Sequence, residues 1–171
     1  MLEPRIIRIM KKIMKYEKLD VTYITPFIST NDDLLDYNKI FKKINIIINK
    51  KEIKNVEKLI EDKKNITIYD DNDIIKKINS IDQDIIFISS CPIITNDLKI
   101  IKNEFLKDNE IIDIINMYGK TVKFIILKVP IKYNFNNFSN NIHYSEINIH
   151  NEANNKKYYY ISLKTNYKPN N

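Results

Sequence analysis

Glycine is almost absent from this 171-residue chain, which contains a single one, Gly119. A loop that wraps around a nucleotide or S-adenosylmethionine needs glycine, because only a residue without a Cβ lets the backbone turn tightly and approach the ligand. Alanine is as scarce, with Ala153 alone, whereas lysine, isoleucine, asparagine and tyrosine abound. This bias follows A/T-rich codons, so it reflects the base composition of the genome more than the needs of the protein.

Cysteine, histidine and long apolar runs are scarce too. The single cysteine, Cys91, excludes an internal disulfide framework, and the two histidines offer no metal-ligand spacing with it. The first residues are charged where a signal peptide needs an apolar run, and no stretch approaches the length of a transmembrane helix. We therefore expect a cytoplasmic protein with no membrane contact and no metal.

The formal net charge of +6 raises the question of a polyanionic partner. RNA would account for such a charge, and the run Tyr158–Tyr160 beside Lys156 and Lys157 would suit base stacking. Codon bias toward lysine accounts for the charge equally well, because the lysines are scattered through the chain rather than clustered. Contact with RNA therefore stays open at this point.

Strands and helices alternate along most of the chain. Short β-branched runs predict strands at 21–25, 44–49, 65–69, 84–90 and 121–129. Helical spacing of apolar residues predicts helices at 4–18, 31–43, 50–63, 74–78 and 95–118. This alternation indicates right-handed βαβ units and a parallel sheet.

Beyond Pro130 the pattern changes. Segment 131–141 is rich in asparagine and predicts a loop where a crossover helix would normally follow. Segments 143–150 and 156–165 predict an antiparallel β-hairpin. We expect one α/β domain over residues 1–171, with a mostly parallel sheet flanked by helices and the last crossover helix reduced or absent.

The turn after the first strand is where a doubly wound α/β fold binds a cofactor. Here the turn has no glycine and carries two bulky apolar side chains; its residues are Thr25, Pro26, Phe27, Ile28 and Ser29. We expect this degenerate loop to bind no cofactor. Gly119, in contrast, falls where a predicted helix stops, which favours a left-handed C-cap there.

This order of elements resembles the Rossmann-like fold of the S-adenosylmethionine-dependent methyltransferases. Within them the chain resembles the RNA 2'-O-methyltransferases and the poxvirus cap methyltransferase. It also resembles the small regulatory subunit of the poxvirus mRNA-capping enzyme, a catalytically silent relative of that fold. The resemblance covers residues 5–168 and rests on the pattern and order of elements.

The active family uses a Lys-Asp-Lys-Glu tetrad to deprotonate and orient the ribose hydroxyl. The positions that the resemblance assigns to it are, in order, Arg8 or Lys11, then Ser90, then Lys128, then Tyr158 or Lys157. Serine and tyrosine do not supply the two negative charges, so Lys128 has no evident means of activation. We expect a vestigial tetrad and no catalysis; Lys128 reads equally well as a strand-end lysine.

Other residues that could take part in catalysis or metal binding have ordinary structural explanations. His143 and His150 flank one predicted strand, where surface or loop roles are typical. Cys91 could be a nucleophile, but no histidine lies near it in the sequence, and a buried apolar cysteine is the ordinary case. The carboxylates within 70–73 resemble a Mg²⁺ site, but their place before an apolar helical run favours stabilisation of the helix N-terminus.

The missing crossover helix predicts an apolar face that another protein covers. The residues expected there are Phe124, Ile126, Tyr133, Phe135 and Phe138. We therefore expect a heterodimer with a larger protein. The resemblance implies a non-catalytic subunit that binds and stimulates the guanine-N7 methyltransferase of a cytoplasmic viral or virus-like mRNA-capping enzyme. A diverged but active cap 2'-O-methyltransferase and an RNA-binding subunit of a transcription or polyadenylation complex are the alternatives.

Overall fold

The computed structural model describes residues 12, 18–26, 28, 38–89, 105–130, 139–144, 146–151 and 158–165. Its strands are β1 (Asp20–Thr25), β2 (Lys43–Ile48), β3 (Ile66–Asp70), β4 (Ile85–Ile88), β5 (Phe124–Pro130), β6 (Glu146–Asn151) and β7 (Tyr158–Lys164). The strand order is β3-β2-β1-β4-β5-β7-β6. This mixed, mostly parallel sheet with antiparallel C-terminal strands confirms the predicted fold class.

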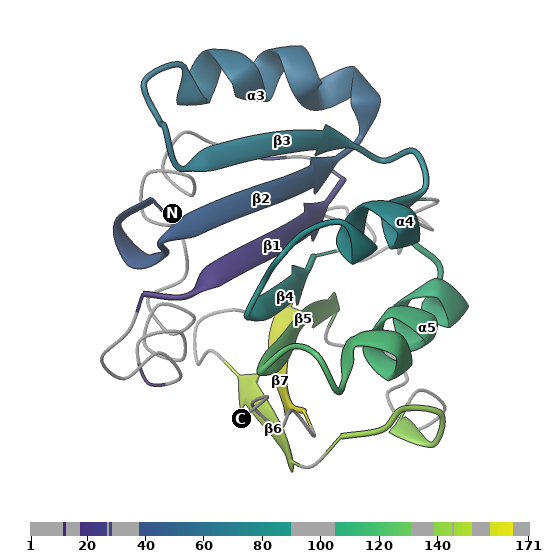
Figure 1. Cartoon of the computed structure of the whole chain (residues 1–171). Coiled ribbons are helices and arrows are strands. Elements are labelled where there is room, and N and C mark those ends of the chain that lie inside the picture. Colours follow the sequence, from purple (N-terminus) through teal and green to yellow (C-terminus); the bar gives the residue numbers. More distant parts are fainter. Residues whose placement is uncertain are drawn as a thin grey trace. The chain divides into compact units, whose positions relative to one another are not determined.

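The chain divides into two compact units, Met1–Ile85 and Ile86–Asn171. In the first unit, β1, β2 and β3 lie side by side and run parallel (Figure 1). Every residue from Ile44 to Ile48 is buried, as expected of a strand covered on both faces. Asn45 is the one polar residue in that run, and its register partners are Thr22 on β1 and Thr67 on β3.

Helices connect these strands. A 3₁₀ turn, η1 (Lys50–Glu52), leads into α3 (Ile53–Ile60), and α4 (Ile74–Asn79) follows β3. The helix predicted to reach residue 43 ends at Ile40 instead, because Lys43 already pairs with Asp20 as the first residue of β2. Among the described residues, no helix is long and apolar enough to cross a membrane.

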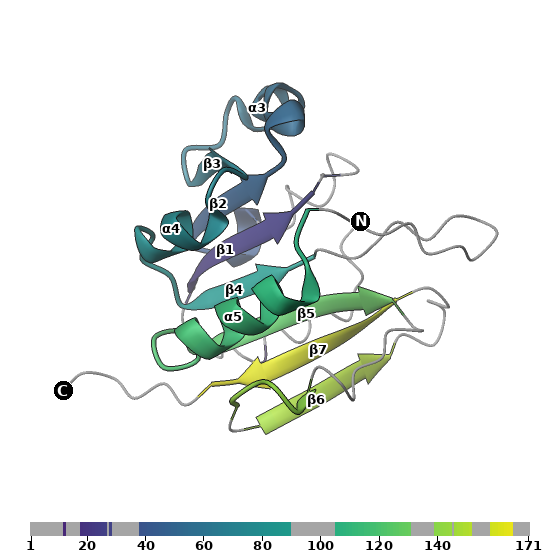
Figure 2. The same ribbon diagram turned by 90° about the vertical axis from the view of Figure 1, so that its right-hand side faces the viewer.

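In the second unit, β7 lies between β5 and β6 and is antiparallel to both (Figure 2). The pairing of β6 with β7 confirms the predicted hairpin. Helix α5 (Asp108–Tyr118) lies beside one face of these strands and buries Ile111, Ile114 and Ile115. Of the predicted helix 4–18, only Lys12, which is helical, and Lys18, which is not, are described, and most of the predicted loop 131–141 falls outside the described residues.

Gly119 ends α5, but not in the left-handed conformation that we expected. Its φ is −62°, which any residue adopts, and its N–H donates to the Ile115 carbonyl at 2.9 Å. Space is what restricts this position. A Cβ would lie 2.9 Å from the Ile115 oxygen and 3.4 Å from the His143 oxygen, so close packing of backbone, rather than a positive φ, favours glycine.

Candidate functional site

The carboxyl ends of β1, β2 and β3 form one edge of the first unit. Thr25, Ile48 and Asp70 end these strands, and the register places Thr25 beside Ile48 and Ile48 beside Asp70. In open α/β sheets, ligands bind outside the carboxyl ends of the strands. This edge is therefore the candidate site, and the side chains that follow each strand decide what it can bind.

The turn after β1 presents side chains rather than bare backbone. Thr25 is buried, and Pro26 and Ile28 are half-buried. Phe27 and Ser29, the other two residues of the predicted degenerate loop, lie outside the described residues. Because each of these residues carries a Cβ, the backbone at this turn lacks the close approach that a glycine loop gives to a bound cofactor.

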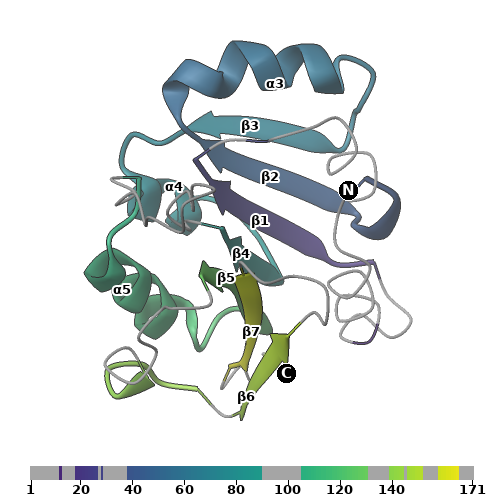
Figure 3. The same ribbon diagram turned by 180° about the vertical axis from the view of Figure 1, so that it is seen from behind.

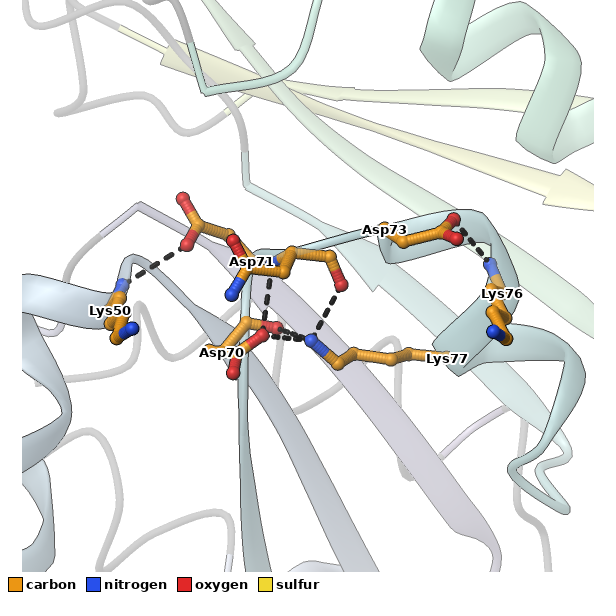
Figure 4. A network of polar contacts seen from close by, with 7 residues as sticks. Lys50, Asp70, Asp71, Asp73, Lys76 and Lys77 are labelled. Carbon is orange, nitrogen blue, oxygen red and sulfur yellow. Dashed lines mark hydrogen bonds and ion pairs between the residues drawn. The ribbon is translucent and has the colours of Figure 1, made fainter.

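The turn after β3 is closed by an ion pair and several hydrogen bonds (Figure 4). The Lys77 ammonium pairs with the Asp70 carboxylate and donates to the backbone carbonyls of Asp70 at 2.9 Å and of Asn72 at 2.6 Å. The Asn72 N–H donates to the same carboxylate at 3.0 Å. Asp71 accepts a hydrogen bond from the Lys50 N–H at 3.2 Å, which ties this turn to the start of η1.

These contacts set the ionisation of Asp70. The hydrogen bond from Lys77 is the main cause that lowers the pKa of Asp70 below its ordinary value, and the Asn72 N–H lowers it further. Asp70 is therefore a stable carboxylate at neutral pH. A group with a lowered pKa is a poor general base, because it holds a proton weakly.

The neighbouring polar side chains also bind the chain's own backbone. Asp73, with φ at 52°, is the N-cap of α4 and accepts from the Lys76 N–H at 3.2 Å, which confirms the predicted capping role. Asn49, the residue after β2, accepts from the Lys51 N–H at 3.1 Å. Within the part of the chain that the structure describes, no three His, Cys, Asp or Glu side chains come together as metal ligands.

Two of the predicted tetrad positions are described, Lys128 and the backbone of Tyr158, and both belong to the second unit. Lys128 on β5 pairs in register with Tyr160 on β7, and Tyr158 pairs with Pro130. The Lys128 ammonium lies 5.9 Å from the centroid of the Tyr160 ring, in the range of a cation–π contact. Tyr160 is 3% exposed, and its ring centroid is 6.4 Å from that of Phe87.

The sequence interpretation missed Tyr160 and Lys77. Tyr160 was part of a recognised tyrosine run, but only the register of the hairpin places it, rather than Tyr158, opposite Lys128. Lys77 lies in α4, seven residues after Asp70, and the turn between them brings the two side chains together. The tetrad positions Arg8 and Ser90, and also Lys11 and Lys157, lie outside the described residues.

The predicted partner surface is only partly described. Phe124 is half-buried, but Ile126 is fully buried within the chain, so its side chain does not lie on an uncovered face as we expected. Tyr133, Phe135 and Phe138 lie outside the described residues. Ile126 is buried in the chain itself because it sits in the middle of β5, paired in register with Ser162 of β7, which is buried as well.

Of the two histidines and the cysteine, only His143 has a described side chain. It is exposed, and the backbone N–H of His143 donates to the Asn116 side-chain oxygen at 2.9 Å. His150 pairs in register with Tyr160 on β7. Cys91 lies outside the described residues.

No family model and no curated protein matches the sequence. Solved structures do match. The N-methyltransferase NodS from Bradyrhizobium japonicum is 7% identical with a TM-score of 0.59, and the match covers 95% of each chain. The precorrin 8w decarboxylase from Methanobacterium thermoautotrophicum is 14% identical with a TM-score of 0.62, covering 94% of this chain and 90% of that one.

A third similar structure is that of an enzyme that modifies RNA. The 23S rRNA methyltransferase ErmE is 8% identical with a TM-score of 0.56, and the match covers 95% of this chain and 68% of that chain. At such identities the likeness concerns the fold alone. The chain has the Rossmann-like fold of the S-adenosylmethionine-dependent methyltransferases.

Proposed function

We propose that this chain is a catalytically inactive, methyltransferase-like regulatory subunit. It binds and stimulates a larger catalytic subunit, the guanine-N7 methyltransferase of a cytoplasmic viral or virus-like mRNA-capping enzyme. The observation that carries the proposal is the single glycine of the sequence, Gly119, which lies between α5 and β5. A methyltransferase fold without a glycine for its cofactor loop suits a role that does not use the cofactor.

The edge formed by β1, β2 and β3 supports this proposal. The Asp70 carboxylate is engaged by Lys77, and Asp71 by the backbone of Lys50. A ribose or adenine group would compete with these contacts for the same carboxylate oxygens. Side chains that already stabilise the turn suit an edge that does not bind the cofactor.

The residue types at the tetrad positions point the same way. Serine at 90 and tyrosine at 158 supply neither of the two carboxylates that the active family uses. A lysine acts as a base only when its surroundings lower its pKa. Lys128, packed beside the buried Tyr160 ring, fits a structural role in the hairpin.

A non-catalytic subunit stimulates its partner by binding the active conformation more tightly than the inactive one, and the shift equals that difference in affinity. The surface proposed for this contact includes Phe124, which is half-buried on β5, together with the aromatic residues of segment 131–138. The alternative of an active cap 2'-O-methyltransferase keeps one supporting observation, the lysine at 128 on the fifth strand.

The decisive assay uses capped RNA and labelled S-adenosylmethionine, with the purified chain alone and with the guanine-N7 methyltransferase subunit from the same source. We expect no methyl transfer by the chain alone and a faster N7 reaction in the mixture. The variant Lys128→Met should stimulate as well as the wild type. Ribose methylation by the chain alone that Lys128→Met abolishes would establish the active alternative instead. RNA retention that weakens with salt, without stimulation, would establish the RNA-binding alternative.

A further inference from the structure

Strand β6 forms one end of the strand order, after β7 (Figure 3). It pairs with β7 over its whole length, from Glu146 opposite Lys164 to Asn151 opposite Tyr159, with no residue skipped. On its other side it has no partner strand among the described residues. The backbone groups along that side form a template for one more strand.

The sequence of β6 contains few of the usual protections of an edge: Glu146, its first residue, is charged, but the strand has no lysine and no proline. Soluble proteins blunt such strands with lysine, proline, a bulge or very short length. β6 has six residues, Glu-Ile-Asn-Ile-His-Asn, and its pairing with β7 is continuous. Ile149 is 55% exposed and Ile147, on the same face, is half-buried, so an apolar pair of side chains lies along the open edge.

We propose that a second copy of this chain adds its own β6 to this edge, antiparallel and with the twofold axis at Asn148. This register places Ile147 opposite Ile149 of the second copy and Glu146 opposite its His150. Two apolar pairs then meet across the axis, and such cross-strand pairs stabilise a sheet. Moving the axis to Ile147 or Ile149 leaves one isoleucine pair in place of two, so the register centred on Asn148 is the one in which β6 is most self-complementary.

The proposal does not depend on the proposed function, because it is argued only from the pairing and exposure of β6. A strand pair of this length is a small interface, so we expect a dimer that dissociates on dilution. Sedimentation of the full chain over a range of concentrations measures this equilibrium directly.

Ile149→Lys is the informative variant. It removes the apolar pairs, and burial of an isoleucine side chain contributes enough that the dimer dissociation constant should rise by about tenfold or more. The matched control is Met117→Lys on α5, where the side chain is 49% exposed in the same unit. The control should leave the dissociation constant unchanged, and both variants should keep the monomer folded because both positions are exposed.

A cysteine at position 148 tests the register. Opposite residues of an antiparallel pair have Cα atoms about 4.5–5.5 Å apart, which suits a disulfide. With Cys91→Ser, oxidised Asn148→Cys should give a covalent dimer, and Met117→Cys should not. A chain that is monomeric at every soluble concentration overturns the proposal. So does a dimer that Ile149→Lys does not weaken, or a β6 edge protected only when a different protein is bound.

Discussion

The Lys77 side chain holds together the turn between β3 and α4, because its ammonium contacts one carboxylate and two backbone carbonyls. We predict that Lys77→Gln raises the pKa of Asp70 toward its ordinary value. Titration of the Asp70 carboxyl by NMR measures the change. Lys76→Gln is the control, since only the backbone of Lys76 takes part in the turn. A pKa of Asp70 that is the same in both variants would contradict the assigned cause.

The same ion pair links stability to pH in a defined direction. The folded-state pKa of Asp70 is lowered, so its contribution is present above the unfolded-state pKa and is lost as the pH falls through the folded-state pKa. That window lies below about pH 4, the ordinary pKa of an aspartate. The difference in free energy of unfolding between wild type and Lys77→Gln should therefore shrink as the pH falls into this range.

Asn45 is a polar residue in the middle of a buried strand. It is fully buried in β2, and neither atom of its amide has a hydrogen-bond partner among the described residues. We predict that Asn45→Leu, which keeps the branch point, raises the free energy of unfolding by about 1 kcal/mol. Urea denaturation measures this change in the free energy of unfolding.

Thr22, the register partner of Asn45 on β1, gives a control of opposite sign. It is also fully buried, but its hydroxyl donates to the Gln83 side chain. Thr22→Val should therefore lower the free energy of unfolding by about 1 kcal/mol, because it leaves Gln83 without that donor. A loss of stability in Asn45→Leu as well would show that the Asn45 amide is satisfied.

At the scale of single elements, the strands could be predicted from the sequence, although β5 begins at Phe124 and β6 at Glu146, each three residues later than predicted. The run Ile44–Ile48 is buried on both faces, and such runs of β-branched residues are typical of interior strands. Helix ends are harder to predict. The helix before β2 ends at Ile40 because pairing of Lys43 with Asp20 decides where the strand begins, and that pairing involves residues far apart in sequence.

Gly119 shows why a residue can be predicted as special for the wrong reason. A lone glycine after a helix favours a left-handed cap, but the structure gives it an ordinary φ and a close approach to two carbonyl oxygens. Only the packed structure brings His143 to this position.

We predict that Gly119→Ala lowers the free energy of unfolding by about 1–3 kcal/mol, the usual cost of overpacking. The added methyl would press on the Ile115 carbonyl at the end of α5. Thermal and urea denaturation measure the loss. Lys120→Ala, at the exposed next residue, is the control and should change little. Equal stability of Gly119→Ala and wild type would show that the helix end shifts freely.

At the scale of the whole molecule, fold and function depend on different numbers of residues. The fold follows from dozens of apolar positions whose periodicity survives sequence change, so it could be predicted. The site depends on a few residues, and of the tetrad positions only Lys128 and the backbone of Tyr158 are described. A partner leaves no periodic pattern in the sequence, which is why the expected apolar face was wrong at Ile126.

Isothermal titration of the purified chain with S-adenosylmethionine tests the central claim most directly. A chain with one glycine, and with its strand-end carboxylates engaged by its own lysine and backbone, should give no binding tighter than about 1 mM. An active methyltransferase titrated in the same buffer verifies the assay. A dissociation constant in the micromolar range would contradict the account, because it would mean that the fold has kept a working cofactor site without a glycine loop.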